Sequence, residues 1–196
     1  MERMITVLVL LILKEELSAS AYPDSVRAGE NITLECETSC YQPPSIVWFK
    51  DGRPISKPVF QAQAGDSGNY SCANEGQESV KSDPVTLDVQ YAPLNVSIEM
   101  SRPGPLVKGS NVSLTCSDTA NPAADNHTWY KALTSSVLSS MLKVGSGQVL
   151  SLPSLNATHS GLYLCRVRNS VGEGNSMGVL LMVYETDPTD SESQGD

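Results

Sequence analysis

The sequence has few aromatic side chains and few histidines. Two Phe, two Trp and two His are present among 196 residues. This is thin for one large hydrophobic core, but it suits two small β-sandwiches that each pack around one Trp. The two His and the scattered carboxylates show no metal-ligand spacing, and no nucleophile motif precedes a helix. We therefore expect two small domains, no cofactor, no metal and no enzymatic activity.

A membrane-spanning run is also missing. The longest apolar run is Met4–Leu13, which follows Arg3. Ten helical residues reach about 15 Å, against a hydrocarbon core of about 30 Å. The small residues Ala19-Ser20-Ala21 then offer a cleavage site, so we predict a secretory signal peptide over 1–21, although the charged Lys14–Glu16 is unusual there. The expected location is extracellular: the cell surface if a membrane span follows in a longer protein, and secreted otherwise.

Basic residues are too few for nucleic-acid binding. The chain has 13 Lys and Arg against 22 Asp and Glu, a formal net charge of -9. A negative net charge disfavours a nucleic-acid partner. Five acidic residues and no basic one lie in 185–196, which we predict to be an acidic disordered tail. Without this tail and 1–21, 14 acidic residues face 11 basic ones, so the folded part is only mildly acidic.

The strongest pattern present is an internal repeat. Residues 29–36 and 109–116 both read Gly-x-Asn-apolar-x-Leu-x-Cys, and each is followed by a Trp 12 or 13 residues after the Cys. Each copy then has Ser-Gly-x-Tyr-x-Cys, at 67–72 and 160–165, and ends in alternating apolar residues. The repeated framework residues are Cys36, Trp48, Tyr70 and Cys72 in the first copy and Cys116, Trp129, Tyr163 and Cys165 in the second.

Alternation within the copies indicates β-strands. A strand points successive side chains to opposite faces, so Ile32, Leu34 and Cys36 share one face. Tyr70 and Cys72 share the inward face of a later strand in the same way. The framework residues therefore point into the core of a sheet-based domain.

The framework, in this order, resembles the immunoglobulin superfamily, in its short constant or intermediate type, over residues 24–184. The resemblance implies an all-β fold of two tandem immunoglobulin-like β-sandwiches, over 22–91 and 92–184. It implies the disulfide pairs Cys36–Cys72 and Cys116–Cys165, with each Trp packed on a bridge and a tyrosine corner at each framework Tyr. No flexible spacer separates the copies, which predicts a stiff two-domain rod.

Two positions depart from the usual pattern. Cys72 follows Trp48 by only 24 residues, so the middle strands of the first domain must be very short. An Asp-Gly pair at 51–52 predicts a tight hairpin turn there. In the second domain His159 replaces the Asp that usually precedes Ser-Gly, so an Asp-mediated loop clamp is absent.

A narrower similarity concerns 34–40, 46–52 and the joint at 91–93, with 121–122 and 129–131 in the second copy. These segments resemble B-cell inhibitory co-receptor-like proteins, which are relatives of the sialic-acid-binding immunoglobulin-type lectins (Siglecs). Fc-receptor-like proteins and intercellular or vascular adhesion molecules share much of it. The resemblance implies a recognition or adhesion module, the outer part of an immune-cell receptor, that binds a protein or glycan ligand on another cell. A soluble decoy or isoform without an anchor is the alternative, and a structural spacer is a third.

Six Asn-x-Ser/Thr sequons predict a glycosylated, secreted surface. Glycans at these positions limit which faces can touch a partner. The acceptor residues are Asn31, Asn69, Asn95, Asn111, Asn126 and Asn156.

Cys40 is the odd cysteine of five. Intercellular adhesion molecules bridge this position to a Cys four residues after the second framework Cys, where this chain has Gly76. One interpretation is a thiol left from a lost bridge, and another is an interchain disulfide that links a homodimer. A catalytic thiol is disfavoured because neither His127 nor His159 lies near it in the expected topology.

Arg166 and Arg168 are the candidate ligand-binding residues. They flank Val167 just after Cys165, so both should point outward from their strand. An Arg on this strand of the Siglec lectin domain grips a carboxylate, and a guanidinium suits that task. That lectin domain is of the longer variable type, which neither copy matches, so no sialic-acid site is carried over and two solvated arginines are the simpler interpretation.

Overall fold

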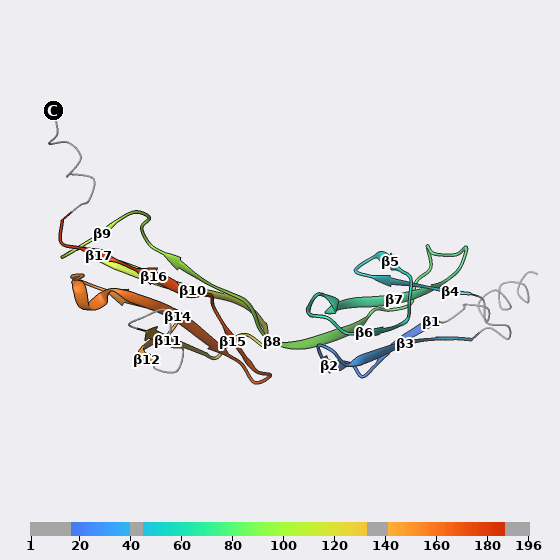
Figure 1. Ribbon diagram of the computed structural model, residues 1–196. Helices are drawn as coiled ribbons and strands as arrows, with labels where there is room; N and C mark the ends of the chain where they lie inside the picture. The colour runs from blue at the N-terminus through green and yellow to red at the C-terminus, as the bar shows by residue number, and fades with distance from the viewer. Residues whose placement is uncertain (1–16, 40–44, 133–140, 187–196) are drawn as a thin grey trace, which may run out of the picture. The chain divides into compact units, whose positions relative to one another are not determined.

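The computed structural model describes residues 17–39, 45–132 and 141–186. The chain divides into two compact units, Met1–Gln90 (unit 1) and Tyr91–Asp196 (unit 2). The described residues form β-strands and two short 3-10 turns, η1 (Ala64–Asp66) and η3 (Ala157–His159) (Figure 1). The predicted all-β class is confirmed.

Unit 1 is a sandwich of two sheets (Figure 1). The first sheet has the order β1 (Leu17–Tyr22), β3 (Asn31–Thr38) and β6 (Val59–Gln61). The second contains β2 (Ser25–Arg27), the first part of β8 (Val85–Met100), β7 (Gly68–Asn74), β4 (Ile46–Lys50) and β5 (Arg53–Ile55).

Unit 2 repeats this plan. The last part of β8 pairs with β10 (Val112–Asn121), which pairs with β13 (Val149–Leu152). The opposite sheet is β12 (Leu142–Ser146), β11 (Asn126–Ala132), β14 (Gly161–Arg168) and then β15 (Glu173–Asn175) and β16 (Val179–Leu181), which both pair with β14. A short parallel pair, β9 (Leu106–Val107) with β17 (Val183–Tyr184), completes the described strands.

Each unit has its own hydrophobic core, built from alternate residues of facing strands. In β3, for example, Ile32 and Leu34 are buried while Asn31 and Glu35 are exposed. The unit 1 cluster contains ten buried residues and the unit 2 cluster contains twelve. Trp48 and Trp129 belong to these clusters, as the repeat predicts.

Strand β1 uses residues that the predicted signal peptide includes. Leu17–Tyr22 pairs antiparallel with Thr33–Thr38, and Ala21 is buried. Small side chains that resemble a cleavage site also suit a strand that packs closely on a core. The predicted boundary after residue 21 lies within strand β1, and the two compact units meet between Gln90 and Tyr91. Residues 1–16 and most of the predicted tail lie outside the described residues.

The middle of unit 1 is as short as its spacing predicts. Asp51 and Gly52 have φ values of 48° and 80° and connect the paired residues Lys50 and Arg53. Two consecutive residues with positive φ are the signature of a type I′ hairpin turn. Strands β5 and β6 then have three residues each.

Candidate functional site

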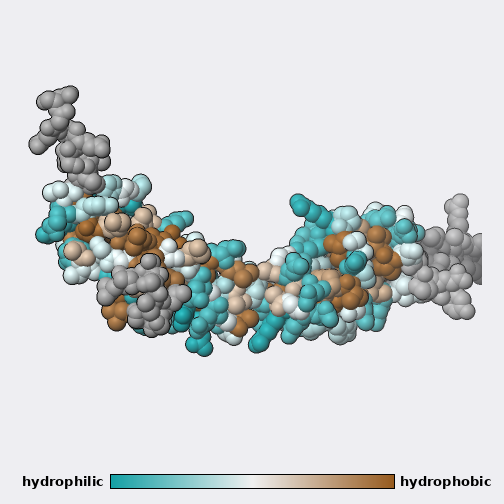
Figure 2. All heavy atoms as spheres, viewed as in Figure 1, coloured by the Kyte–Doolittle hydropathy of each residue, from teal (hydrophilic) through white to brown (hydrophobic). Residues whose placement is uncertain are grey.

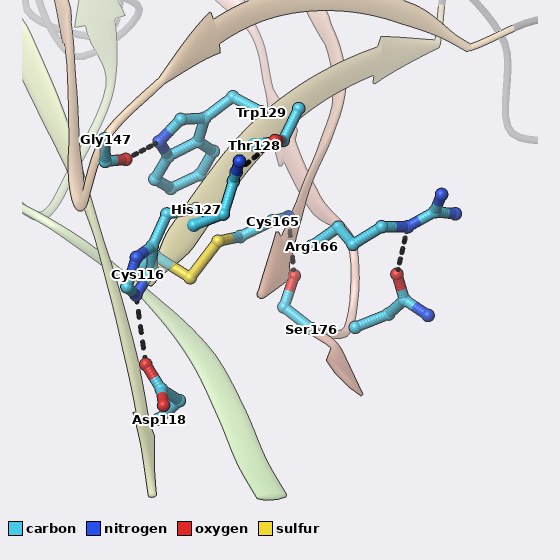
Figure 3. The surroundings of a disulfide bond; sticks show 11 residues. Cys116, Asp118, His127, Thr128, Trp129, Gly147, Cys165, Arg166 and Ser176 are labelled. Atoms are coloured by element: carbon cyan, nitrogen blue, oxygen red, sulfur yellow. Dashed lines mark hydrogen bonds and ion pairs between the residues drawn. A yellow bond between two sulfur atoms is a disulfide. The ribbon is translucent and has the colours of Figure 1, made fainter. Parts of the chain in front are cut away.

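The two framework disulfides join the sheets of each unit. Cys36 is bonded to Cys72 and Cys116 to Cys165, with Cα–Cα distances of 6.2 and 6.3 Å. In unit 2 the fully buried Trp129 packs beside the bridge, and its indole N–H donates to the carbonyl oxygen of Gly147 at 2.9 Å (Figure 3). These are the pairs that the immunoglobulin resemblance implies.

Both framework tyrosines form tyrosine corners. The hydroxyl of Tyr70 donates to the carbonyl oxygen of Asp66 at 2.8 Å, and that of Tyr163 to His159 at 2.9 Å. Burial, and then the negative charges of Asp66 and Asp51, raise the pKa of Tyr70 to about 12. Burial also raises the pKa of Tyr163. Each hydroxyl is therefore held protonated as a donor to the turn before its strand.

Two lysines that the sequence analysis missed hold the same turns. Lys50 donates its ammonium to the carbonyl oxygen of Gly65 in unit 1, and Lys131 donates to Thr158 in unit 2. Burial lowers the pKa of Lys131. The available signal was that each Lys follows the framework Trp by two residues.

A polar pair inside unit 2 was also missed. Nε2 of His127 lies 3.0 Å from Oδ1 of Asp118, and both side chains are largely buried (Figure 3). Asp118 is on β10 and His127 on β11, so the pair links the two sheets near the disulfide. Asp118 lies two residues after Cys116 and His127 lies two residues before Trp129, so the alternation of a strand points both side chains inward. This spacing was the signal that could have identified the pair.

Arg166 and Arg168 lie on the outer face of β14, exposed as expected. Figure 3 shows Arg166 extending away from the disulfide, and its Nε donates to Oδ1 of Asn175 at 3.0 Å. Its guanidinium carbon is 5.2 Å from the centre of the Tyr130 ring. A shallow groove of about 180 Å³ runs along this face, lined by Asn126, Thr128, Tyr130, Arg166, Arg168 and Glu173.

All six sequon asparagines are exposed: Asn31, Asn69, Asn95, Asn111, Asn126 and Asn156. In several of them the carboxamide oxygen accepts a hydrogen bond. Oδ1 of Asn126 accepts from the hydroxyl of Thr128 at 2.9 Å, and Oδ1 of Asn156 accepts from the N–H of Thr158 at 2.9 Å. The nitrogen that a glycan would modify lies on the same exposed side chains.

One end of unit 1, which we call the loop end, is separate from the sequons of that unit. It is formed by the beginning of β1, the end of β3, the beginning of β4 and the segment 75–84 that follows β7. The Cα partners Leu17 and Thr38, and Ile46 and Asn74, place these pieces together.

The sequons of unit 1 lie toward the other end. Asn31 is the first residue of the eight-residue strand β3, which puts it about 23 Å from Thr38 at about 3.3 Å per residue. Asn69 is five positions before Asn74 on β7, about 17 Å by the same rise. In unit 2, by contrast, sequons occur at both ends, at 95 and 126 near one and at 111 and 156 near the other.

The loop end is acidic. Glu37, Glu75, Glu78 and Asp83 are exposed there, against Lys81 as the basic residue among the described ones. A hydrogen bond from the N–H of Gly76 holds the pKa of Glu78 below its usual range. The ammonium of Lys81 lies 3.8 Å from the centre of the Phe49 ring. A groove of about 580 Å³ opens beside these residues, lined by 17–19, 37–39, Asp83 and Pro84.

A second surface feature is apolar and lies on unit 2. A groove of about 290 Å³ is lined by Met100, Leu180, Met182 and Tyr184, among others. Leu180 and Met182 are 60% and 53% exposed. Figure 2 shows hydrophobic residues gathered over this part of unit 2. Besides the groove at Arg166 and Arg168, the described surface thus offers an acidic candidate region on unit 1 and an apolar one on unit 2.

Several expectations concern features outside these surfaces. Cys40, with its proposed interchain bridge, lies outside the described residues. Within 17–39, 45–132 and 141–186 there is no cluster of three metal-ligating side chains. No helix in this part of the chain is long and apolar enough to cross a membrane.

Family profiles match both units. The profile described as "Immunoglobulin domain" matches residues 15–89 in one version and 96–169 in another. The chain belongs to the immunoglobulin superfamily. The first match begins at residue 15, so it includes strand β1.

Among known proteins, the chain is 29% identical over 171 residues to the mouse B-cell receptor CD22, covering 84% of this chain and 19% of that protein. It is 30% identical over 176 residues to mouse hemicentin-1, covering 78% of this chain and 3% of that protein. The chain therefore spans a small part of these relatives. The ectodomain of mouse nectin-like molecule 4 superposes with a TM-score of 0.63 at 23% identity, covering 89% of this chain and 65% of that one. This immunoglobulin tandem thus resembles the ectodomains of cell-surface receptors and adhesion proteins.

Proposed function

We propose that this immunoglobulin tandem is an extracellular recognition module of a cell-surface receptor or adhesion protein, and that it binds a protein on another cell through the loop end of unit 1. The observation that carries the proposal is the placement of the sequons. Residues 70–94 contain none, whereas every other end of the two units has a nearby acceptor Asn. Glycans are bulky, so a partner is most easily accommodated where no acceptor lies.

The type of structure at this end supports the same choice. Loops at the ends of immunoglobulin sandwiches are held by a rigid scaffold and commonly carry binding contacts. The segment 75–84 is such a loop, and Ser82 anchors it because its Oγ accepts the N–H of Cys72 at 3.0 Å. The similarity to the B-cell receptor CD22 supports a receptor ectodomain, with an immune cell as the proposed setting.

The charge of the loop end defines the class of partner. Four exposed carboxylates favour a basic protein surface and repel an anionic glycan such as one that ends in sialic acid. Because exposed charges are screened by salt, binding should weaken as the ionic strength rises.

The test uses the full chain, expressed in mammalian cells and tetramerised as a fluorescent probe for a panel of leukocytes and stromal cells. Glu75→Lys with Glu78→Lys should abolish staining of any cell type that the original chain stains. Asp24→Lys with Glu99→Lys, exposed positions away from the loop end, is the charge-matched control and should retain it. Equal staining by both variants, loss of staining after sialidase treatment of the cells, or no staining of any cell would overturn the proposal.

A further inference from the structure

The groove lined by Arg166 and Arg168 on unit 2, which we call the arginine groove, contains a sequon. β11 contributes Asn126 and Thr128, and β14 contributes Arg166 and Arg168. Asn126 is the Cα partner of Arg168, and Thr128 is the partner of Arg166. A glycan attached to Asn126 would therefore begin directly opposite one arginine and beside the other.

The acceptor is arranged to carry a sugar over this face. Asn126 is exposed at the start of β11, and its Oδ1 accepts the hydroxyl hydrogen of Thr128 at 2.9 Å. The carboxamide oxygen is thus occupied by the residue that completes the sequon. The nitrogen of the same carboxamide is the atom that N-glycosylation modifies.

The groove offers chemistry that suits a sugar. Arg166 is held in place by Asn175, lies near the Tyr130 ring, and still has further N–H donors on its guanidinium. Sugar hydroxyls and acetamide oxygens accept such donors, and the apolar face of a sugar ring can pack on Tyr130. Oε2 of Glu173 is 4.0 Å from Nε of Arg166 and partly neutralises it, which suits an uncharged ligand better than a carboxylate.

We infer that Asn126 carries an N-linked glycan whose first sugars lie in this groove and cover Arg166 and Arg168. The face of β11 and β14 is then closed to other ligands in the glycosylated protein. The two arginines, which the sequence marks as candidate ligand-binding residues, serve this chain's own glycan.

The first part of the test is glycopeptide mass spectrometry of the secreted full chain, which should show Asn126 occupied. The second is the rate at which phenylglyoxal modifies Arg166 and Arg168, in the original chain and in Asn126→Gln. If the sugars fill the groove about four-fifths of the time, the arginines should react about fivefold faster in the variant.

Two controls separate glycan cover from a change in the fold. Arg102, an exposed arginine elsewhere in unit 2, should react equally in both proteins. Thr128→Ser keeps the sequon and should keep the arginines protected. An unoccupied Asn126, or occupied Asn126 with equal reaction rates of Arg166 and Arg168 in the original chain and in Asn126→Gln, would overturn the inference. Neither result depends on whether the loop end of unit 1 binds a partner.

Discussion

Units 1 and 2 use different side chains to hold the 3-10 turn before the strand of their second framework cysteine. This turn is η1 before β7 in unit 1 and η3 before β14 in unit 2. In unit 1 the carboxylate of Asp66 accepts the N–H of Gln63 at 2.8 Å. In unit 2 the ring Nδ1 of His159 accepts the N–H of Asn156 at 3.1 Å. The Asp-mediated clamp is absent from unit 2 as expected, but an imidazole supplies an acceptor in the same place. The turn thus requires an acceptor at this position rather than a carboxylate.

The interiors of the two units differ in the same manner. Unit 2 places Asp118 two residues after its first cysteine and His127 two residues before its Trp. The equivalent positions of unit 1 are Thr38 and Ile46, and Ile46 packs against the hydrophobic core. One framework therefore accommodates either a polar pair or an apolar contact between the sheets, provided that buried polar groups have partners.

The largest expected effect comes from removing one bridge at a time. Cys36→Ala with Cys72→Ala, or Cys116→Ala with Cys165→Ala, should each lower the free energy of unfolding by about 4 kcal/mol, because the unfolded chain loses a closed loop. Calorimetry of the full chain should show that the transition of the altered unit moves to lower temperature. The bridge of unit 2 closes the longer loop, with a sequence separation of 49 against 36, so its removal should cost slightly more. If the removal of one bridge moves the transitions of both units equally, the units do not unfold separately.

The second prediction converts the interior of unit 2 into that of unit 1. His127→Ile alone should cost about 2 kcal/mol of stability, because it leaves the largely buried carboxylate of Asp118 without its partner. Adding Asp118→Thr should recover most of this loss, since both polar groups are then replaced. Urea unfolding of the two variants measures the difference. If the double variant is less stable than His127→Ile, the His127–Asp118 pair contributes more to stability than the hydrogen bond that each side chain gives the other.

A smaller effect is expected at the tyrosine corners. Tyr70→Phe and Tyr163→Phe should each lower stability by about 1 kcal/mol, the usual net value of one hydrogen bond.

The contribution of Tyr70 to stability should depend on pH in the alkaline range, which a comparison with Tyr70→Phe can show. Its pKa is about 12 in the folded protein, above the ordinary value of 10.0. The unfolded chain therefore loses this proton first, so the contribution of Tyr70 to stability is full below pH 10 and declines as the pH rises toward 12. Urea unfolding at pH 8 and pH 11 should show a smaller loss in Tyr70→Phe than in the original chain. Equal losses would mean that Tyr70 ionises as freely in the folded state as in the unfolded one.

The repeat framework was sufficient to predict the fold class, the type of domain, the disulfide pairs and the short middle strands of unit 1. These features depend on residue identity and spacing, which a sequence displays directly. The turn at Asp51 and Gly52 belongs to the same class, because its conformation is set by the two residues themselves.

Features that depend on contacts between distant segments were missed. Lys50 and Lys131 reach carbonyl oxygens 15 and 27 residues away, and no local pattern specifies that target. The pairing of Ala19 and Ala21 with β3 is another such contact, because their small side chains fit both a cleavage site and a strand.

The central claim is that the loop end of unit 1 is the recognition surface, and the most direct measurement is to place a glycan there. Gln77 is exposed in the loop, and Gln77→Asn completes an Asn-x-Ser sequon with Ser79. In the tetramer staining assay, chains shown by mass spectrometry to carry this glycan should lose binding. Gln77→Asn with Ser79→Ala, which has the same Asn but no sequon, should bind like the original chain. Retained binding by the glycosylated variant would contradict the account.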